Sequence, residues 1–166
     1  MLAKFWRYIF HTRFVFSFLL ISIIVLADQL TKCLVLEKLP TVGKSIYITS
    51  FLNITLVWNK GVTFGMLNNP NWHSFMPYIL IAVAVATVLL LIRWMNKTSS
   101  FMTSFALALV IGGAIGNILD RIFHGAVVDF LDFHYAGYHW YAFNIADAAI
   151  VTGVAFLILD TVIRGR

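Results

Sequence analysis

The sequence predicts an all-α membrane protein in which four transmembrane helices carry a small β-sheet on the outer face of the membrane. Of its 166 residues, 61% are hydrophobic and 11% are charged, whereas a soluble domain is about 45–50% apolar and about 25% charged. Four apolar segments are each close to the roughly 20 residues that cross a bilayer as a helix. We expect one integral membrane domain spanning residues 1–166, with no separate linker.

The first predicted helix covers residues 11–36. Its apolar core, residues 14–27, is short enough to be the apolar region of a cleavable signal peptide. However, Asp28 and Gln29 stand where small residues would mark a cleavage site, and the apolar pattern resumes at Cys33. The segment is therefore predicted to be a retained helix.

The loop that follows, residues 37–71, is predicted to form strands. Its apolar residues fall on one parity, which is typical of strands with one buried face. These residues are Ile46, Ile48, Leu52, Ile54, Leu56 and Trp58. We expect a small sheet lying on the outer membrane surface.

The other predicted helices cover residues 75–92, 101–122 and 143–163. The core of the second, residues 78–92, contains no charged residue before Arg93, so it is predicted to be lipid-facing scaffold. The third contains Gly112 and Gly116, a spacing of small residues that lets another helix pack closely.

The distribution of basic residues predicts the orientation. Seven of them precede the first helix, join the second to the third, or follow the fourth: Lys4, Arg7, Arg13, Arg93, Lys97, Arg164 and Arg166. Because cytoplasmic loops carry an excess of Lys and Arg, both termini are predicted to be cytoplasmic. This use of the basic residues also explains the net charge of +5 without a nucleic-acid partner.

Every intramembrane acid falls in the outer half of the membrane, with Asp160 as the exception. These acids and the polar residues beside them are Asp28 and Lys32, then Asn117, Asp120 and Arg121, then Asp129 just beyond the third helix, and Asp147 in the fourth. A charge at the bilayer centre costs about 2.5–3.5 kcal/mol on insertion scales. Such a cluster therefore indicates a functional site.

Asp129 and Asp147 each lie in an apolar run without a basic neighbour in sequence. Two carboxyl groups facing each other there would share a proton, as in an aspartic protease. Asn117 and the charged residues Asp28, Lys32, Asp120 and Arg121 also fit a purely structural role. Our hypothesis is that the four charged residues fix the first and third helices against the site.

The sequence resembles the lipoprotein signal peptidases, also called signal peptidase II, of the bacterial inner membrane. The resemblance rests on five motifs in family order: DQLTK at 28–32, NKGVTFGML at 59–67, GGAIGNILDR at 112–121, VVDFLDF at 127–133 and FNIADAAI at 143–150. It implies that Asp129 and Asp147 are the catalytic pair. It also implies a supporting or substrate-binding set, which comprises Asp28, Lys32, Asn59, Gly61, Gly112, Asn117, Asp120, Arg121, Asn144 and Ala146.

The resemblance further implies cleavage of a prolipoprotein signal peptide just before a cysteine that carries diacylglycerol. The expected partners are such substrates and membrane lipid, and we expect a monomer without cofactor, metal or nucleic acid. The loop from Asn59 to Phe64 would reach over the site, and Asn59 or Asn117 could bind the substrate backbone. The sequence departs from the family pattern at two positions. The family often has Ala where this chain has Thr63, and it commonly has Pro after the Trp at position 140, where this chain has Tyr141.

Three other functions compete with this prediction. A proton-coupled transporter would use intramembrane charges, but its relay should continue across the membrane. A metal-dependent hydrolase could use Asp132, His134 and His139, although their spacing is not diagnostic and no HExxH motif is present. A structural adaptor would leave two isolated acids unexplained.

Overall fold

The computed structural model describes residues 2–39, 41–61 and 75–164, with side chains from residue 13 to residue 163 within those ranges. Its helices are α1 (Leu2–Lys38), α3 (Met76–Lys97), α4 (Phe101–His124) and α5 (Ile145–Arg164), and its strands are β1 (Ser45–Thr49), β2 (Leu52–Asn59), β3 (Val127–Tyr135) and β4 (Tyr138–His139). Each helix contains a segment long and apolar enough to cross a membrane. The predicted fold class is confirmed.

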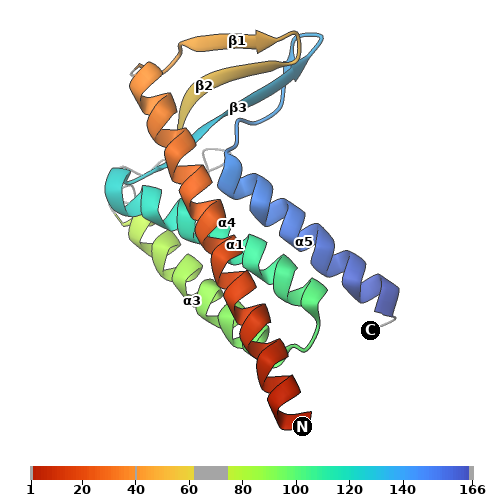
Figure 1. The fold of residues 1–166 in the computed structure, drawn as a ribbon. Helices are drawn as coiled ribbons and strands as arrows, with labels where there is room; N and C mark the ends of the chain where they lie inside the picture. The colour runs from red at the N-terminus through yellow and green to blue at the C-terminus, as the bar shows by residue number, and fades with distance from the viewer. Residues whose placement is uncertain (1, 40, 62–74, 165–166) are drawn as a thin grey trace.

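The helix α4 is the centre of the bundle. It packs against α1, α3 and α5, and 61% of its most apolar stretch is buried, against 11–17% in the other three helices. The exposed apolar faces of α1, α3 and α5 have the character of surfaces that contact lipid. Figure 1 shows the sheet at one end of the helices and the two chain termini toward the other end.

Glycines allow α4 and α5 to approach backbone to backbone. A Cβ atom on Gly113 would collide with the carbonyl oxygen of Ala146, and one on Gly153 would lie 2.6 Å from the carbonyl oxygen of Ala106. Such close contact between helices relies on small residues, because dispersion attraction falls quickly with distance. The α4–α5 pair is thereby held closely where α5 begins.

Local signals set both ends of α4. Ser100 caps its start, with its hydroxyl accepting a hydrogen bond from the Thr103 backbone N–H at 3.1 Å. Gly125 ends it in the left-handed conformation, with φ of 71°, which glycine adopts without steric cost. The chain then turns directly into β3.

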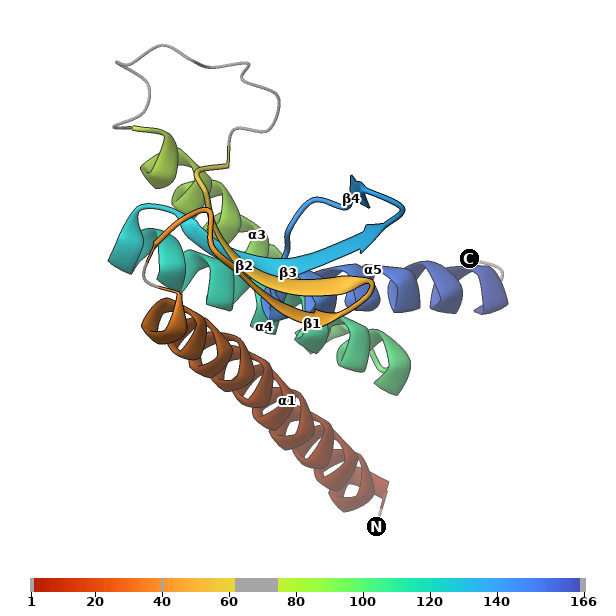
Figure 2. The ribbon, with the colours of Figure 1, turned by 90° about the horizontal axis from the view of Figure 1, so that it is seen from above.

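The sheet has the antiparallel order β1-β2-β3-β4. The sequence predicted strands only within residues 37–71, but half of the sheet comes from residues 127–139. In the view of Figure 2 its strands pass over α4 and the start of α5. The sheet therefore joins the first outer loop to the segment that contains Asp129.

The predicted buried face exists in β2 but not in β1. Leu56 is 2% exposed and, with Ile54 and Trp58, packs against a core made by the end of α1 and by β3. By contrast, Ile46 and Ile48 are 38% and 51% exposed. The expectation was wrong for β1 because it is an edge strand that pairs only with β2.

Candidate active site

Asp147 lies in the first turn of α5, where a capping box fixes its side chain. Asn144 immediately precedes the helix, and its Oδ1 accepts a hydrogen bond from the Asp147 backbone N–H at 2.9 Å. In return, the Asn144 backbone N–H donates to Asp147 Oδ2 at 3.3 Å. This reciprocal pair satisfies N–H groups that a helix start leaves unbonded. It also orients the carboxyl group of Asp147 relative to the helix axis.

Asp129 lies in the middle of β3 rather than at a helix end, as its position just beyond α4 had suggested. Its strand pairs with β2, with Asp129 opposite Val57, and the residues from Val127 to Phe130 are all buried. Asp129 itself is 2% exposed. The carboxyl group is consequently held in a largely apolar stretch of strand.

Asparagine side chains bind both acids. Asn59 Nδ2 donates to Asp129 Oδ2 at 2.9 Å, and Asn144 Nδ2 donates to Asp129 Oδ1 at 2.8 Å. Asn117 Nδ2 donates to Asp147 Oδ1 at 2.8 Å. Asn144 therefore contacts both acids, one through its side-chain amide and the other through its backbone and side-chain oxygen. Asp129 and Asp147 belong to one hydrogen-bond network although they come from different elements.

The network also determines which way each amide faces. Asn59 Oδ1 accepts from the Gly61 backbone N–H at 2.8 Å, in a turn where Gly61 has φ of 76°. Asn117 Oδ1 accepts from Asn144 Nδ2 at 3.2 Å and from Lys32 Nζ at 3.3 Å. Because each amide oxygen already has a donor, each amide nitrogen is directed to a carboxylate.

The pKa of Asp129 is raised to about 6. Burial is the largest cause, because a carboxylate loses its hydration in a buried site, and the nearby charge of Asp147 raises the pKa further. The hydrogen bonds from Asn59 and Asn144 and the charge of Lys32 act in the opposite direction. Asp129 thus takes up a proton much closer to neutral pH than an ordinary aspartate does.

Beneath these acids, Lys32 joins two further carboxylates. Its Nζ lies 2.7 Å from Asp28 Oδ2 and 2.8 Å from Asp120 Oδ2, and none of the three side chains is more than 3% exposed. Asp28 Oδ1 accepts from the Ala146 backbone N–H, and Asp120 Oδ2 accepts from the Val128 backbone N–H, each at 2.9 Å. The cluster of Asp28, Lys32 and Asp120 therefore holds the residue before each of the two acids.

Arg121 lies outside this cluster. Its NH1 donates to the Asn117 carbonyl oxygen of its own helix at 3.2 Å, and its charge interacts with those of Asp147, Asp120 and Asp129. The turn at Gly61 also approaches it, since a Cβ atom there would lie 3.8 Å from Arg121 NH2. Arg121 is thus a half-buried cation beside the acids.

Two glycines of α4 face α1. A Cβ atom on Gly112 would lie 3.0 Å from Ile24 Cβ, and one on Gly116 would lie 2.6 Å from Asp28 Oδ2 and 3.3 Å from Ala146 Cβ. A side chain at Gly116 would therefore displace the carboxylate that holds the start of α5. Ala146 itself is fully buried.

Sequence reasoning missed Gln29. Its Nε2 donates to Asp120 Oδ1 at 2.9 Å and to the Gly116 carbonyl oxygen at 3.3 Å, so it links α1 to α4 beside the Lys32 cluster. A polar residue next to Asp28 inside an apolar helix was the available signal. It was used only to argue against a cleavage site.

The residues of the metal alternative form an ion pair and a ring stack. His139 Nδ1 lies 2.8 Å from Asp132 Oδ1, and the rings of His134 and His139 stack with centroids 5.1 Å apart. Within residues 13–39, 41–61 and 75–163, no three His, Cys, Asp or Glu side chains converge as metal ligands would.

Asp160, the acid predicted to lie away from the others, is far along α5 and accepts a hydrogen bond from Thr103 Oγ1 at 2.8 Å.

Part of the predicted loop lies outside the described residues. The side chains of Asn59 and the turn at Gly61 are described, whereas Thr63 and Phe64 fall in the range 62–74, which is not. The second departure from the family pattern, Tyr141, is 72% exposed. Within the described part of the chain, no hydrogen bond joins it to Asp129 or Asp147.

Comparisons with known proteins identify the family of this chain. The family model described as Signal peptidase (SPase) II matches residues 20–163. A lipoprotein signal peptidase of Janthinobacterium sp. (strain Marseille) is 41% identical over 145 residues, covering 86% of each chain. One of Ralstonia nicotianae is 44% identical over 144 residues, covering 86% of this chain and 81% of the relative.

A solved structure described as a bacterial membrane enzyme, determined by the in meso method at 2.3 Å resolution, superposes with a TM-score of 0.76. It is 30% identical in sequence, and the match covers 88% of this chain and 87% of that one. The fold, the order of the motifs and the relatives agree along most of the sequence. This chain belongs to the signal peptidase II family of membrane peptidases.

Proposed function

We propose that this protein is an aspartic endopeptidase that removes signal peptides from diacylglyceryl-modified prolipoproteins by cutting just before the lipidated cysteine. The observation that carries the proposal is the shared network of Asp129 and Asp147. Two acids from a strand and a helix are bound by three asparagine amides, and the pKa of one of them is raised to about 6. A pair of carboxyl groups with unequal affinity for a proton is what aspartic proteolysis requires.

Asp129 is the acid of the pair and Asp147 the base. Burial favours the protonated form of Asp129. Asp147 lies in the first turn of α5, where the helix dipole favours a negative charge, and the positive charge of Arg121 is close to it. The shared proton is therefore assigned to Asp129.

The reaction then follows from these two states. Asp147 removes a proton from a water molecule, whose oxygen attacks the scissile carbonyl carbon while Asp129 gives its proton to the carbonyl oxygen. The resulting tetrahedral diol loses the bond to nitrogen as the leaving amine takes up the proton from Asp147. Asp129 recovers its proton from a diol hydroxyl as the new carboxyl group forms, so only water is consumed.

The remaining residues implied by the family resemblance keep this pair in place or meet the substrate. Asn59 reaches Asp129 from β2 and is held by the backbone N–H of Gly61. It is suited to bind a substrate backbone, whose peptide groups need partners in lipid. The buried set anchors the elements that carry the acids. It comprises Asp28, Lys32, Gly112, Asn117, Asp120, Asn144 and Ala146.

The substrate meets this site from the outer leaflet of the bacterial inner membrane. The proposed orientation has both termini in the cytoplasm, because seven basic residues precede the apolar stretch of α1, join α3 to α4 or follow α5 in the sequence. The acids lie at the sheet end, where a diacylglyceryl cysteine anchored in the outer leaflet would be held. The relatives are named lipoprotein signal peptidases. We infer a monomer, because the network is complete within one chain.

The test is cleavage of a synthetic diacylglyceryl prolipoprotein peptide, with mass spectrometry of the products. Asp129→Asn and Asp147→Asn should each abolish cleavage while the protein remains folded in detergent. Asp132→Asn is the matched control, since Asp132 lies on the same strand but contacts His139 and Asn53, and it should retain activity. A metal chelator should have no effect.

Near-normal turnover in either dyad variant would rule out the catalytic pair. Loss of activity on chelation, restored by metal, would favour the hydrolase built on Asp132, His134 and His139. Cleavage at a bond other than the one before the lipidated cysteine would support a peptidase activity but would contradict the proposed cleavage position.

A further inference from the structure

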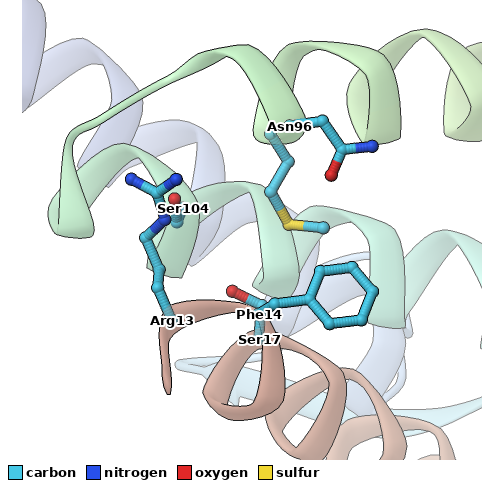
Figure 3. A pocket seen from close by; sticks show the side chains of 6 residues that line it. Arg13, Phe14, Ser17, Asn96 and Ser104 are labelled. Atoms are coloured by element: carbon cyan, nitrogen blue, oxygen red, sulfur yellow. The ribbon is translucent and has the colours of Figure 1, made fainter. Parts of the chain in front are cut away.

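A small pocket lies at the end of the helices away from the sheet. Its volume is about 50 Å³, and it is lined by residues 13–17 of α1, the end of α3 and the start of α4. Figure 3 shows the side chains that line it, which are Arg13, Phe14, Ser17, Met95, Asn96 and Ser104. None of them belongs to the site of Asp129 and Asp147.

Ser17 is the residue that suggests a ligand. It is 1% exposed, and its Oγ has no hydrogen-bond partner within the described part of the chain. A buried hydroxyl without a partner costs about 1–3 kcal/mol, so buried polar groups nearly always have one. A group that enters the pocket would supply it.

The lining favours an anion with several oxygens. A guanidinium from Arg13, a hydroxyl from Ser17 and an amide from Asn96 are all donors to phosphate oxygens. Ser104 lies in the first turns of α4, and helix starts favour negative charge. Arg93 lies one turn before Asn96 on α3 and adds positive charge. Thr103, the residue before Ser104, donates a hydrogen bond from its Oγ1 to Asp160 on α5.

Size and position favour a phosphate group carried by a lipid. A water molecule needs about 10–15 Å³ of such volume, so 50 Å³ accommodates roughly four oxygen-sized groups. The pocket lies where α3 ends at Lys97 and α4 begins at Phe101, which is the depth of the headgroups. Phe14 and Phe18 beside it are 57% and 62% exposed and offer an apolar surface to acyl chains.

We propose that this pocket binds the phosphate group of a phospholipid in the leaflet opposite the peptidase site, which is the cytoplasmic leaflet in the proposed orientation. Arg13, Ser17 and Asn96 donate to the phosphate oxygens, and the acyl chains lie along the apolar face of α1. The bound lipid ties α1 to α3 and α4 at the end where the sheet does not reach. Its effect is on stability rather than on the chemical step.

The experiment measures the melting temperature of the delipidated full-length protein in detergent. Three additions are compared at equal concentration: phosphatidylglycerol, a diacylglycerol with the same acyl chains but no phosphate, and inorganic phosphate. Only phosphatidylglycerol should raise the melting temperature in a saturable way. Equal protection by diacylglycerol, or none by any addition, overturns the proposal, and equal protection by inorganic phosphate shows a free-anion site and overturns the lipid assignment.

Ser17→Ala separates binding from folding. Because Ser17 Oγ is buried without a partner in the described part of the protein, its removal should not lower the lipid-free melting temperature and should raise it slightly. Loss of a hydrogen bond to a charged group should nevertheless weaken phosphatidylglycerol binding about tenfold. Asn96→Ala should act in the same direction.

The matched control is Ser22→Ala, which removes a hydroxyl on the same helix that is bound to the Phe18 carbonyl oxygen. It should bind phosphatidylglycerol as tightly as the wild type. If Ser17→Ala and Ser22→Ala bind the lipid equally tightly, the pocket is not the binding site.

Discussion

Three asparagine amides hold the two carboxyl groups of the proposed dyad, and other groups already fix which way each amide faces. Asn59 and Asn144 bind opposite oxygens of Asp129, while Asn117 binds Asp147. An amide holds a carboxyl group by hydrogen bonds without adding a charge. Unlike a lysine or arginine in the same place, it therefore leaves burial free to raise the pKa of Asp129.

The raised pKa of Asp129 predicts a pH-dependent effect of Asp129→Asn on stability. The unfolded chain releases this proton near pH 4, whereas the folded protein releases it near pH 6. The folded state therefore binds more protons in this window, and the wild type loses stability as the pH rises through it. The loss in the free energy of unfolding reaches its full size above the pKa of Asp129 in the folded protein, and it is about 3 kcal/mol at most.

Asp129→Asn lacks this cost. The melting temperature of the variant minus that of the wild type should therefore rise between pH 4.5 and pH 7.5, in the same detergent and buffer series. The absolute difference also includes the clash of one new amide donor with Asn59 or Asn144, which does not change with pH. A difference that stays constant over this range would mean that Asp129 is not buried as a neutral acid.

At the scale of elements, the Lys32 cluster joins two helices to the segments that carry the acids. Lys32→Met should leave the carboxylates of Asp28 and Asp120 buried without their cation. Breaking a buried ion pair in this way costs about 3–5 kcal/mol, and the shifted backbones of Ala146 and Val128 should lower turnover as well. Thermal melting and turnover of the same preparation measure both effects.

Lys38→Met is the control for this change, because Lys38 ends the same helix but is exposed. It should leave melting and turnover unchanged. Adding Asp120→Asn to Lys32→Met should recover part of the lost stability, since one uncompensated charge is removed. If Lys32→Met were as stable as the wild type, the cluster would not hold the elements together.

The contact between α4 and α5 predicts an order among glycine variants. Gly113→Ala should destabilise the protein and lower turnover, because its Cβ would collide with the Ala146 carbonyl oxygen next to Asp147. A Cβ atom at Gly112 would lie 3.0 Å from Ile24 Cβ, so a side chain has to shift by a few tenths of an ångström there rather than a backbone carbonyl, and alanine gains up to about 1 kcal/mol in helix propensity. Melting temperatures should therefore rank Gly112→Ala above Gly113→Ala, and the reverse order would contradict the close contact.

At the scale of the whole molecule, the sheet and the proposed dyad lie at one end of the helices, and the basic loops lie at the other (Figure 1). The proposed dyad would consequently act at one membrane surface only. This arrangement agrees with a peptidase whose substrate is anchored in one leaflet. It does not provide the continuous line of charges that a proton-coupled transporter needs.

Cysteine labelling tests the orientation. The native Cys33 is exposed, so it is first replaced by alanine, and single cysteines are then placed at Ser99 or Lys44. Ser99 lies between α3 and α4, and Lys44 lies just before β1. A membrane-impermeant reagent added from the outside should label position 44 and not position 99. The opposite pattern would invert the proposed topology.

The sequence by itself determined the membrane class, the four helices, the family and the gathering of acids near one membrane surface. These features are encoded locally, because hydrophobicity over about 20 residues and the positions of charges do not depend on tertiary partners. The motifs around Asp129 and Asp147 likewise stand in the sequence with their spacing. For this reason the fold class and the family were predicted and confirmed.

Only the tertiary structure decided that Asp129 lies on a strand. The run from Val127 to Phe130 is buried on both faces, and such a run shows no alternation that would distinguish a strand from a buried helix. Its partner β2 lies about 70 residues earlier in the sequence, so no local pattern predicts that the two strands pair. The direction of the three asparagine amides, the closeness of Gly113 to Ala146 and the separation of Arg121 from the Lys32 cluster were also decided by tertiary contacts, because each depends on groups brought together from different elements.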